Sequence, residues 1–135
     1  MYEIKKELIL LLNNTYSIYS DYQCASIVID KNKNKYKGVN VENVSFGATS
    51  CAERNAIFNA VANGMKMGDL EEVHIMSNYK KTNNKDYFAF PCGICRQVIS
   101  EASTDNAKIF IYNQNGLVKK YNIKKLLPNS FKEDI

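Results

Sequence analysis

Hydrophobic residues recur along the chain with two periods, which predict four helices and five strands. Ile4, Leu8 and Leu12 share one face of a helix, whereas alternating segments such as 22–28 are typical of strands with one buried face. The expected helices cover about residues 2–14, 51–63, 92–102 and 123–127, and the expected strands cover 22–29, 35–41, 73–77, 108–112 and 117–121.

Turn residues separate these elements. The polar segments 30–34 and 113–116 each join two expected strands and predict two hairpins. Gly64 is expected to close the second helix, and Pro128 to stop the last one. The chain contains no internal repeat, low-complexity segment or interdomain linker, so one domain over residues 1–135 is expected. Two helices on parallel strands, with a hairpin at each end, predict a three-layer α/β/α domain with a mixed sheet of about five strands.

Composition limits the class of protein and its location. A chain of 135 residues with 45% hydrophobic residues can form a core without disulfide bonds. The longest early apolar run, Leu8–Leu12, is far too short to span a bilayer, and no small-residue cleavage site follows it. We therefore expect a cytoplasmic protein with no membrane partner. The formal charge of +4 comes from lysines scattered among asparagines, which does not indicate a nucleic-acid partner.

Three cysteines and a glutamate suggest a catalytic metal site. Cys51 opens one expected helix, and Cys92 and Cys95 open another, where first-turn amides favour the thiolate form. Three thiolates can hold one zinc ion per chain and leave its fourth position for water, as in catalytic zinc sites. Glu53, two residues after Cys51, can then carry the proton of that water.

Other roles have to be weighed for Glu53, Cys24 and His74. Glu53 could instead complete a capping box with Ser50 at the start of the helix, an interpretation that the second cysteine pair disfavours. Cys24 could close a four-cysteine structural site, but its place inside an alternating strand favours a small core residue. His74, the only histidine, is expected in the core, which leaves Glu53 as the candidate general base.

Arginine is rare in this lysine-rich chain. Its two arginines, Arg54 and Arg96, each directly follow a cysteine motif. A zinc ion with three thiolates carries a net negative charge, and a guanidinium that donates to the sulfurs would restore its acidity. We expect this role of Arg54 in particular.

The order of these motifs resembles the cytidine deaminases, and cysteine as first ligand resembles their small homotetrameric members. The resemblance implies hydrolytic deamination of cytidine and deoxycytidine to uridine and deoxyuridine (EC 3.5.4.5) in pyrimidine salvage. It implies that water activated on zinc attacks C4 of the free nucleoside, while Glu53 protonates N3 and then the departing ammonia. Asn40 and Glu42 match the positions that hold the ribose hydroxyls. The resemblance is carried by Gly38–Asn43, Cys51–Arg54, Pro91–Val98 and Leu126–Phe131.

The chain departs from that family at three places. Tyr22 stands where a phenylalanine usually packs beside the pyrimidine, the segment Cys24–Ser26 is closer to blasticidin S deaminases, and the loop 78–90 is long. A deaminase of another aminated nucleoside and a non-catalytic zinc-stapled RNA-binding module therefore remain alternatives. The C-terminal segment resembles one that carries an aromatic residue into a neighbouring subunit, which implies a homotetramer with Phe131 at an adjacent nucleoside site.

Overall fold

Five strands form one mixed sheet in the computed structural model, which describes residues 2–132. The strands lie in the order β2-β1-β3-β4-β5. β1 pairs antiparallel with both β2 and β3, β3 pairs parallel with β4, and β4 pairs antiparallel with β5. Their bounds are β1 Tyr22–Asp30, β2 Lys35–Val39, β3 Leu70–Tyr79, β4 Ser103–Tyr112 and β5 Val118–Asn122.

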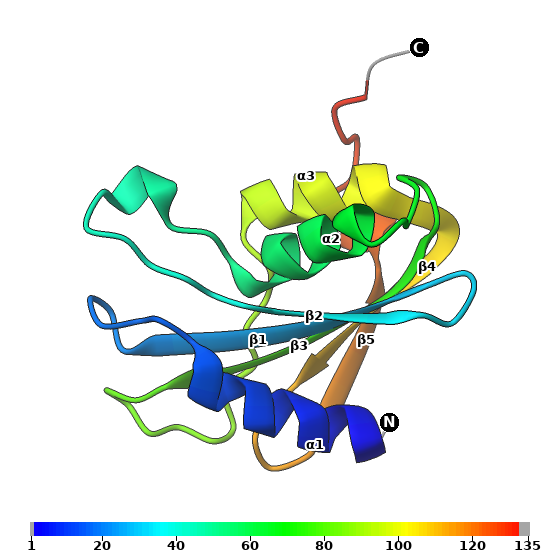
Figure 1. Ribbon diagram of the computed structural model, residues 1–135. Helices are drawn as coiled ribbons and strands as arrows, with labels where there is room; N and C mark the ends of the chain where they lie inside the picture. Colours follow the sequence, from blue (N-terminus) through cyan, green and yellow to red (C-terminus); the bar gives the residue numbers. More distant parts are fainter. Residues whose placement is uncertain (1, 133–135) are drawn as a thin grey trace.

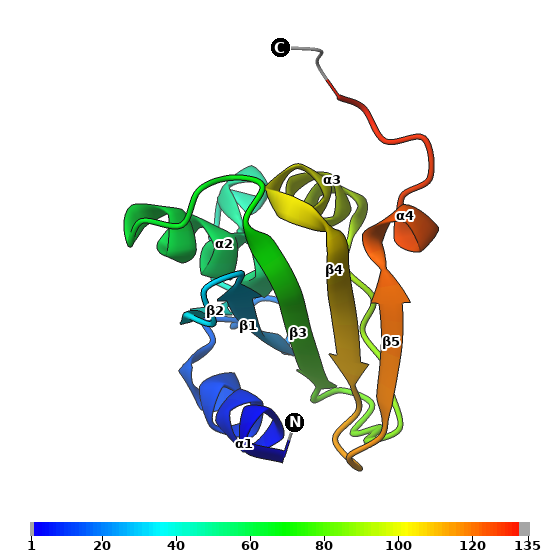
Figure 2. The ribbon, with the colours of Figure 1, turned by 90° about the vertical axis from the view of Figure 1, so that its right-hand side faces the viewer.

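Helices cover both faces of this sheet and complete the predicted α/β/α arrangement (Figure 1). α1 (Tyr2–Leu11) lies on one face, and α2 (Ala52–Ala62) and α3 (Gly93–Ala102) lie side by side on the other. The short helix α4 (Ile123–Leu126) follows β5 at the edge of the sheet, as the second view shows (Figure 2). The larger apolar cluster fills the space beneath α2 and α3, and a smaller one lies beneath α1.

Both predicted hairpins are confirmed, and side-chain hydrogen bonds explain their turns. The Asp30 carboxylate accepts the amides of Asn32 and Asn34 at 2.9 and 3.0 Å, which fixes the turn between β1 and β2. In the second hairpin Asn113 Oδ1 accepts the amide of Leu117 at 2.9 Å, and Gly116 adopts a φ of 95°.

The structure differs from the expected boundaries in several elements. The first helix continues beyond Leu11 only as a 3₁₀ turn over Leu12–Asn14. β3 is longer than predicted at both ends, and β4 begins at Ser103 rather than at residue 108. The early part of β4 is polar, and its register with β3 shifts: Ser103 lies opposite Leu70, and Lys108 lies opposite Glu72. This segment therefore lacks the regular alternation by which a strand is recognised.

His74 is a core residue, as predicted. Its ring stacks on Phe110 at 4.6 Å between centroids, and its nitrogens contact the Tyr112 hydroxyl at 2.7 Å and Glu72 Oε1 at 2.8 Å. Burial lowers the pKa of His74. His74 is therefore neutral near pH 7 and takes no part in the cysteine site. Among the described residues, no helix is long and apolar enough to cross a membrane.

A close approach of backbone to backbone sets the position of α2. A Cβ atom on Gly38 of β2 would stand 2.3 Å from the Ala56 nitrogen and 2.5 Å from the Ala52 carbonyl oxygen. Only glycine allows the helix to lie so near the strand. Because Ala52 is the first residue of α2, this contact also places the cysteine motif at the start of the helix.

Candidate active site

The three cysteines of the two motifs meet where α2 and α3 begin. Cys51 is the N-cap of α2, and Cys92 is the N-cap of α3 with its sulfur accepting the amide of Cys95. The three sulfurs lie within 4.8 Å of one another, and those of Cys51 and Cys92 are 3.8 Å apart. A tetrahedral ion with Zn–S bonds of about 2.3 Å separates its sulfurs by about 3.8 Å. The spacing therefore fits zinc.

Local contacts prepare one of these thiols for a metal. The pKa of Cys51 falls to about 5, because Cys95 donates a hydrogen bond to its sulfur and Arg54 does so as well. The Arg54 Nη2 lies 3.3 Å from that sulfur. The pKa of Cys95 rises, through the same contact with Cys51 and through burial. In the metal-free protein Cys95 therefore holds a proton that a coordinated ion would displace.

Glu53 is buried beside these sulfurs with only 4% of its surface exposed. Burial raises its pKa to about 7. The capping-box alternative is wrong, because the Ser50 amide donates to the Val41 carbonyl at 3.0 Å and the Ser50 hydroxyl to Asn55 Oδ1 at 2.6 Å. The Glu53 carboxyl therefore makes no capping box with Ser50, although it accepts a hydrogen bond from its own backbone amide in the first turn of α2. A pKa near neutrality suits a group that accepts and returns protons.

A cavity of about 220 Å³ opens in front of Glu53 and brings most of the predicted site residues together. Tyr22, Asn40 and Glu42 all line it, although they come from β1 and from the segment after β2. Phe131 does not line it: its side chain is 77% exposed in the C-terminal segment of its own chain. The complete lining is Tyr22, Cys24, Asn40, Glu42, Thr49, Ser50, Cys51, Glu53, Ile75, Ala89, Phe90 and Cys92.

Asn40 and Glu42 are held in place by backbone groups. Asn40 Oδ1 accepts the Cys24 amide at 2.8 Å, and its Nδ2 donates to the Tyr22 carbonyl at 2.7 Å, so it continues the sheet beyond the end of β2. Glu42 Oε1 accepts the amides of Tyr19 and Ser20 at 3.0 and 3.2 Å. Each side chain keeps further hydrogen-bonding capacity toward the cavity, namely a second N–H of Asn40 and further lone pairs of Glu42.

Comparison with known proteins identifies the family. The sequence profile described as "Cytidine and deoxycytidylate deaminase zinc-binding region" matches residues 3–111. The cytidine deaminase of Mycoplasma genitalium is 35% identical over 130 residues, which cover 96% of this chain and 94% of that protein. The chain belongs to the cytidine deaminase family. That of Halalkalibacterium halodurans is 32% identical over 126 residues, or 93% of this chain and 89% of that protein.

Solved structures agree with this assignment. The crystal structure of cytidine deaminase from Burkholderia pseudomallei superposes with a TM-score of 0.85 at 27% identity, covering 96% of this chain and 98% of that chain. The mixed five-stranded sheet is therefore the fold of cytidine deaminases. Cys51, Cys92 and Cys95 are the zinc ligands of this cytidine deaminase, and Cys24 lies outside the group of three sulfurs, as predicted.

The two arginines of this cytidine deaminase differ in what they contact. Arg54 donates to a ligand sulfur, as its sequence position suggested. Arg96, which also follows a cysteine motif, instead donates its Nε to the Pro91 carbonyl and its Nη1 to the Leu126 carbonyl, both at 2.8 Å. Arg96 thus ties the loop before Cys92 to α4 and has a structural role.

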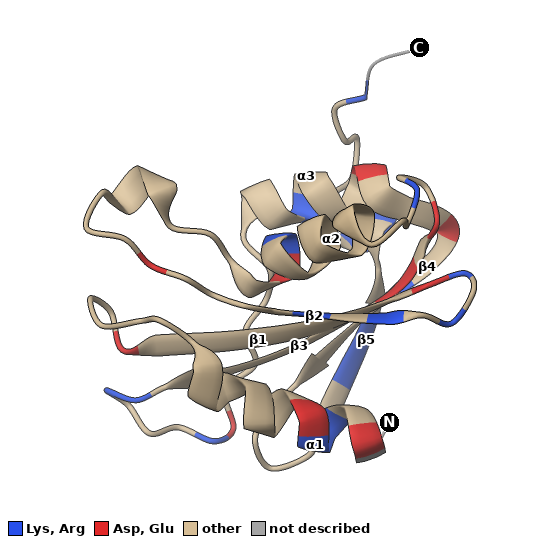
Figure 3. Ribbon diagram, in the orientation of Figure 1, with Lys and Arg blue, Asp and Glu red and all other residues tan. Residues whose placement is uncertain are grey.

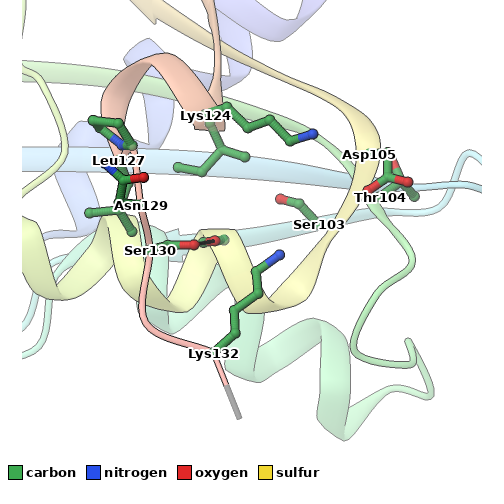
Figure 4. Close-up of a pocket in the computed structure, with 11 residues that line it drawn as sticks. Ser103, Thr104, Asp105, Lys124, Leu127, Asn129, Ser130 and Lys132 are labelled. Atoms are coloured by element: carbon green, nitrogen blue, oxygen red, sulfur yellow. Dashed lines mark hydrogen bonds between the residues drawn. The ribbon is translucent and has the colours of Figure 1, made fainter. Parts of the chain in front are cut away.

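Sequence reasoning missed some of the residues around the cavity. Cys24 was assigned to the core, and it is buried, but its sulfur also lies 3.7 Å from Glu53 Oε1. Ile75 lies on the face of β3 that packs beneath α2 and α3, a placement that the alternation of β3 could have indicated. A separate hollow beneath the C-terminal segment is lined by none of the predicted site residues (Figure 4).

Proposed function

We propose that this protein hydrolyses cytidine and deoxycytidine to uridine and deoxyuridine in pyrimidine salvage, with its whole chain serving as one catalytic domain. The observation that carries this proposal is the buried carboxyl of Glu53 in the wall of a cavity that also contains two zinc ligands. In this reaction a C4–O bond replaces the C4–N bond. Water supplies its oxygen to C4, one proton to N3 and one to the departing ammonia.

Glu53 is the group that moves these protons. It takes a proton from the attacking water, delivers it to N3, and later transfers the second to the leaving nitrogen. A pKa raised to about 7 by burial permits both directions of transfer near neutral pH. Bound zinc supplies the Lewis acidity that makes water nucleophilic at this pH. Arg54 supports that acidity by withdrawing charge from the Cys51 sulfur.

Three lining residues would orient the nucleoside. Asn40 and Glu42 would hydrogen-bond the ribose hydroxyls with the capacity that their backbone contacts leave free. Tyr22 would pack beside the pyrimidine, braced by edge contacts with Tyr79 and Tyr87 at 5.9 and 6.5 Å between ring centroids. Ser20 also donates to the Glu42 carboxylate, so the loop that precedes Tyr22 fixes this acidic group.

The charge around the cavity supports a nucleoside rather than a nucleotide. A second cavity, lined by Tyr19, Ser20, Glu42, Phe46 and Thr49, shares Glu42 and Thr49 with the first. Among the described residues that line either cavity there is no lysine or arginine. Within one chain, neither cavity therefore offers a 5′-phosphate a lysine or arginine to balance its charge.

The distribution of positive charge does not favour the RNA-binding alternative. Lysines are spread over β2, β5 and several loops (Figure 3). Three of them, Lys31, Lys33 and Lys35, form ion pairs with Asp69, Glu71 and Glu7 at 3.0–3.3 Å. A nucleic-acid groove requires unpaired cations along one continuous path.

The enzymatic assay separates these possibilities. Purified protein is incubated with cytidine, deoxycytidine or deoxycytidylate, and absorbance and ammonia are followed while zinc is counted by metal analysis. We expect about one zinc per chain, one ammonia per nucleoside consumed, and no reaction with deoxycytidylate. Absence of ammonia from both nucleosides in zinc-loaded protein would refute the proposed function.

The assembly proposed for this enzyme is a homotetramer in which Phe131 reaches a neighbouring nucleoside site. The side chain of Phe131 is 77% exposed, and the loop beside the second cavity also exposes Val44 and Phe46, at 76% and 75%. Apolar groups that are exposed close together, as Val44 and Phe46 are in this loop, are typical of surfaces that bind a partner. Pro128 directly follows Leu127, the C-cap of α4, and starts the segment that carries Phe131 outward.

Mixing two impaired variants tests this assembly. Light scattering should give four chains per particle, and Phe131→Ala should raise the KM for cytidine without loss of zinc. Co-refolded Phe131→Ala and Glu53→Gln chains should form some sites with both groups intact and recover part of the activity. A fully active monomer, or mixtures with no recovery, would contradict the shared site.

A cytoplasmic location completes the proposal. All four cysteines are free, and three of them are needed as thiolate ligands. Reducing compartments preserve thiols, whereas oxidising ones favour disulfides. Fractionation of the source cells should place the activity with the cytoplasmic enzymes.

A further inference from the structure

A buried thiol that is not a zinc ligand contacts the Glu53 carboxyl. Cys24 Sγ lies 3.7 Å from Glu53 Oε1, within the range of a hydrogen bond from sulfur. Both side chains are nearly inaccessible, with 6% of Cys24 and 4% of Glu53 exposed, and both line the cavity in front of the zinc ligands. A neutral thiol is a weak donor and a carboxylate is a strong acceptor, so when Glu53 is ionised the proton of this contact lies on sulfur.

The backbone beneath Cys24 is fixed on both sides. Its amide donates to Asn40 Oδ1 at 2.8 Å, and Cys24 stands opposite Ser77 where β1 pairs with β3 in the interior of the sheet. Val28, four residues further along the same face of β1, lies in the same apolar cluster. The thiol therefore approaches Glu53 from a rigid strand, whereas Glu53 itself stands on the first turn of α2.

Zinc binding leaves Cys24 as the thiol donor to this carboxyl. In the metal-free protein Cys95 also hydrogen-bonds Glu53. Cys95 gives up its proton when it becomes a zinc ligand, and its sulfur can then only accept. Cys24 lies outside the group of ligand sulfurs and keeps its proton.

We propose that Cys24 is a positioning residue for Glu53: its S–H donates to Oε1 and holds the carboxyl so that Oε2 exchanges protons with water and substrate. This inference rests on the proposed deaminase function. The proposal assigns the thiol a role in the rate of proton transfer. Together with the Glu53 backbone amide, which also hydrogen-bonds the carboxyl, the thiol keeps the second oxygen at a constant angle to the cavity. Binding of the nucleoside does not require this contact.

Matched variants at position 24 separate the hydrogen bond from packing. Cys24→Val fills the site without a donor, and Cys24→Ser keeps a donor. With zinc content equal, we expect Cys24→Val to lower kcat about 5- to 10-fold at a KM within twofold of wild type, as for loss of an ordinary hydrogen bond. Cys24→Ser should stay within about twofold of the wild-type kcat, because a hydroxyl also donates. Equal rates in the wild type and both variants would overturn the positioning role.

Infrared spectroscopy tests the hydrogen bond without reference to activity. In the zinc-loaded protein three of the four cysteines are deprotonated ligands, so the S–H stretching band reports Cys24 alone, and Cys24→Ser should abolish it. Glu53→Gln, which keeps a weaker acceptor oxygen, should move the band slightly to higher frequency, and Glu53→Ala, which removes the acceptor, should move it further. A band that does not move in either variant would refute the contact.

The two assays distinguish failure of this inference from failure of the proposed function. A zinc-loaded wild type that deaminates neither nucleoside would refute both the function and the positioning role. An active wild type whose Cys24→Val and Cys24→Ser variants lose activity equally, with a raised KM, would show that Cys24 acts only through packing.

Discussion

Replacing Gly38 by alanine is expected to displace the helix that carries Cys51 and Glu53. The new Cβ would stand 2.3 Å from the Ala56 nitrogen and 2.5 Å from the Ala52 carbonyl oxygen, both of them backbone atoms. Ordinary contact begins near 3.4 Å, so α2 would have to withdraw by about 1.1 Å, the difference between 3.4 and 2.3 Å. Backbone atoms cannot rotate away as a flexible side chain can, which makes this an overpacked site without an easy escape.

The expected cost lies at the upper end of overpacking, about 3 kcal/mol in the free energy of unfolding. For a chain of this size about 3 kcal/mol corresponds to a fall in Tm of roughly 12 °C. Displacement of about 1 Å at a catalytic group can also lower a rate by about 100-fold. Thermal unfolding of the zinc-loaded protein, followed by circular dichroism, measures the first effect, and the cytidine assay measures the second.

Gly47 provides the matched control. No heavy atom lies within 4 Å of a Cβ placed at Gly47, so Gly47→Ala should leave Tm and kcat close to wild type. A Tm for Gly38→Ala within about 2 °C of wild type would refute the claim that the strand–helix approach requires glycine.

Three further predictions concern charge and metal. Arg54→Lys should lower kcat about 10- to 100-fold, because lysine cannot present the planar fork of the guanidinium to the sulfurs. Arg96→Lys should instead lower Tm and leave kcat unchanged. Equal effects of both substitutions on kcat would contradict the separate roles of the two arginines. Burial lowers the pKa of His74 in the folded protein, so unfolded chains bind more protons than folded ones below pH about 6.5. As the pH falls through this range, the free energy of unfolding should decrease by up to about 1.4 kcal/mol per pH unit. Urea titrations should show that His74→Gln loses this pH dependence, and an unchanged slope would contradict the role of His74. Zinc removal by a chelator should abolish turnover and lower Tm, and added zinc should restore both; activity that persists without zinc would refute the metal site.

The elements with strong local signals could be predicted from the sequence. Both hairpins followed from turn residues whose side chains do close the turns, as Asp30 and Asn113 show. The zinc ligands could be predicted because both cysteine motifs stand at helix starts. Cys51 and Cys92 are 41 positions apart, and they come together once the two helices pack side by side. The early half of β4 could not be predicted, because Ser103–Asn106 is polar and precedes the point where the regular register with β3 resumes, at Lys108.

Side-chain directions were harder to predict than elements. Arg54 and Arg96 stand in similar sequence contexts, yet one contacts a ligand sulfur and the other contacts two backbone carbonyls. The proximity of Cys24 to Glu53 joins residues 29 positions apart through the packing of α2 on β1. Such a contact depends on how closely a helix packs on a sheet. In this protein Gly38 sets that distance, and no local sequence pattern encodes it.

The central claim is that Glu53 moves protons for hydrolysis of a nucleoside at a three-cysteine zinc site. Comparing kcat for cytidine between zinc-loaded wild type and zinc-loaded Glu53→Gln tests it most directly, because glutamine keeps the size of the side chain and cannot carry a proton. We expect the variant to fold, to retain about one zinc per chain, and to lose activity by at least the roughly 10²–10⁴-fold usual for a general acid–base. A zinc-loaded Glu53→Gln protein that turns over cytidine at the wild-type rate would contradict the claim.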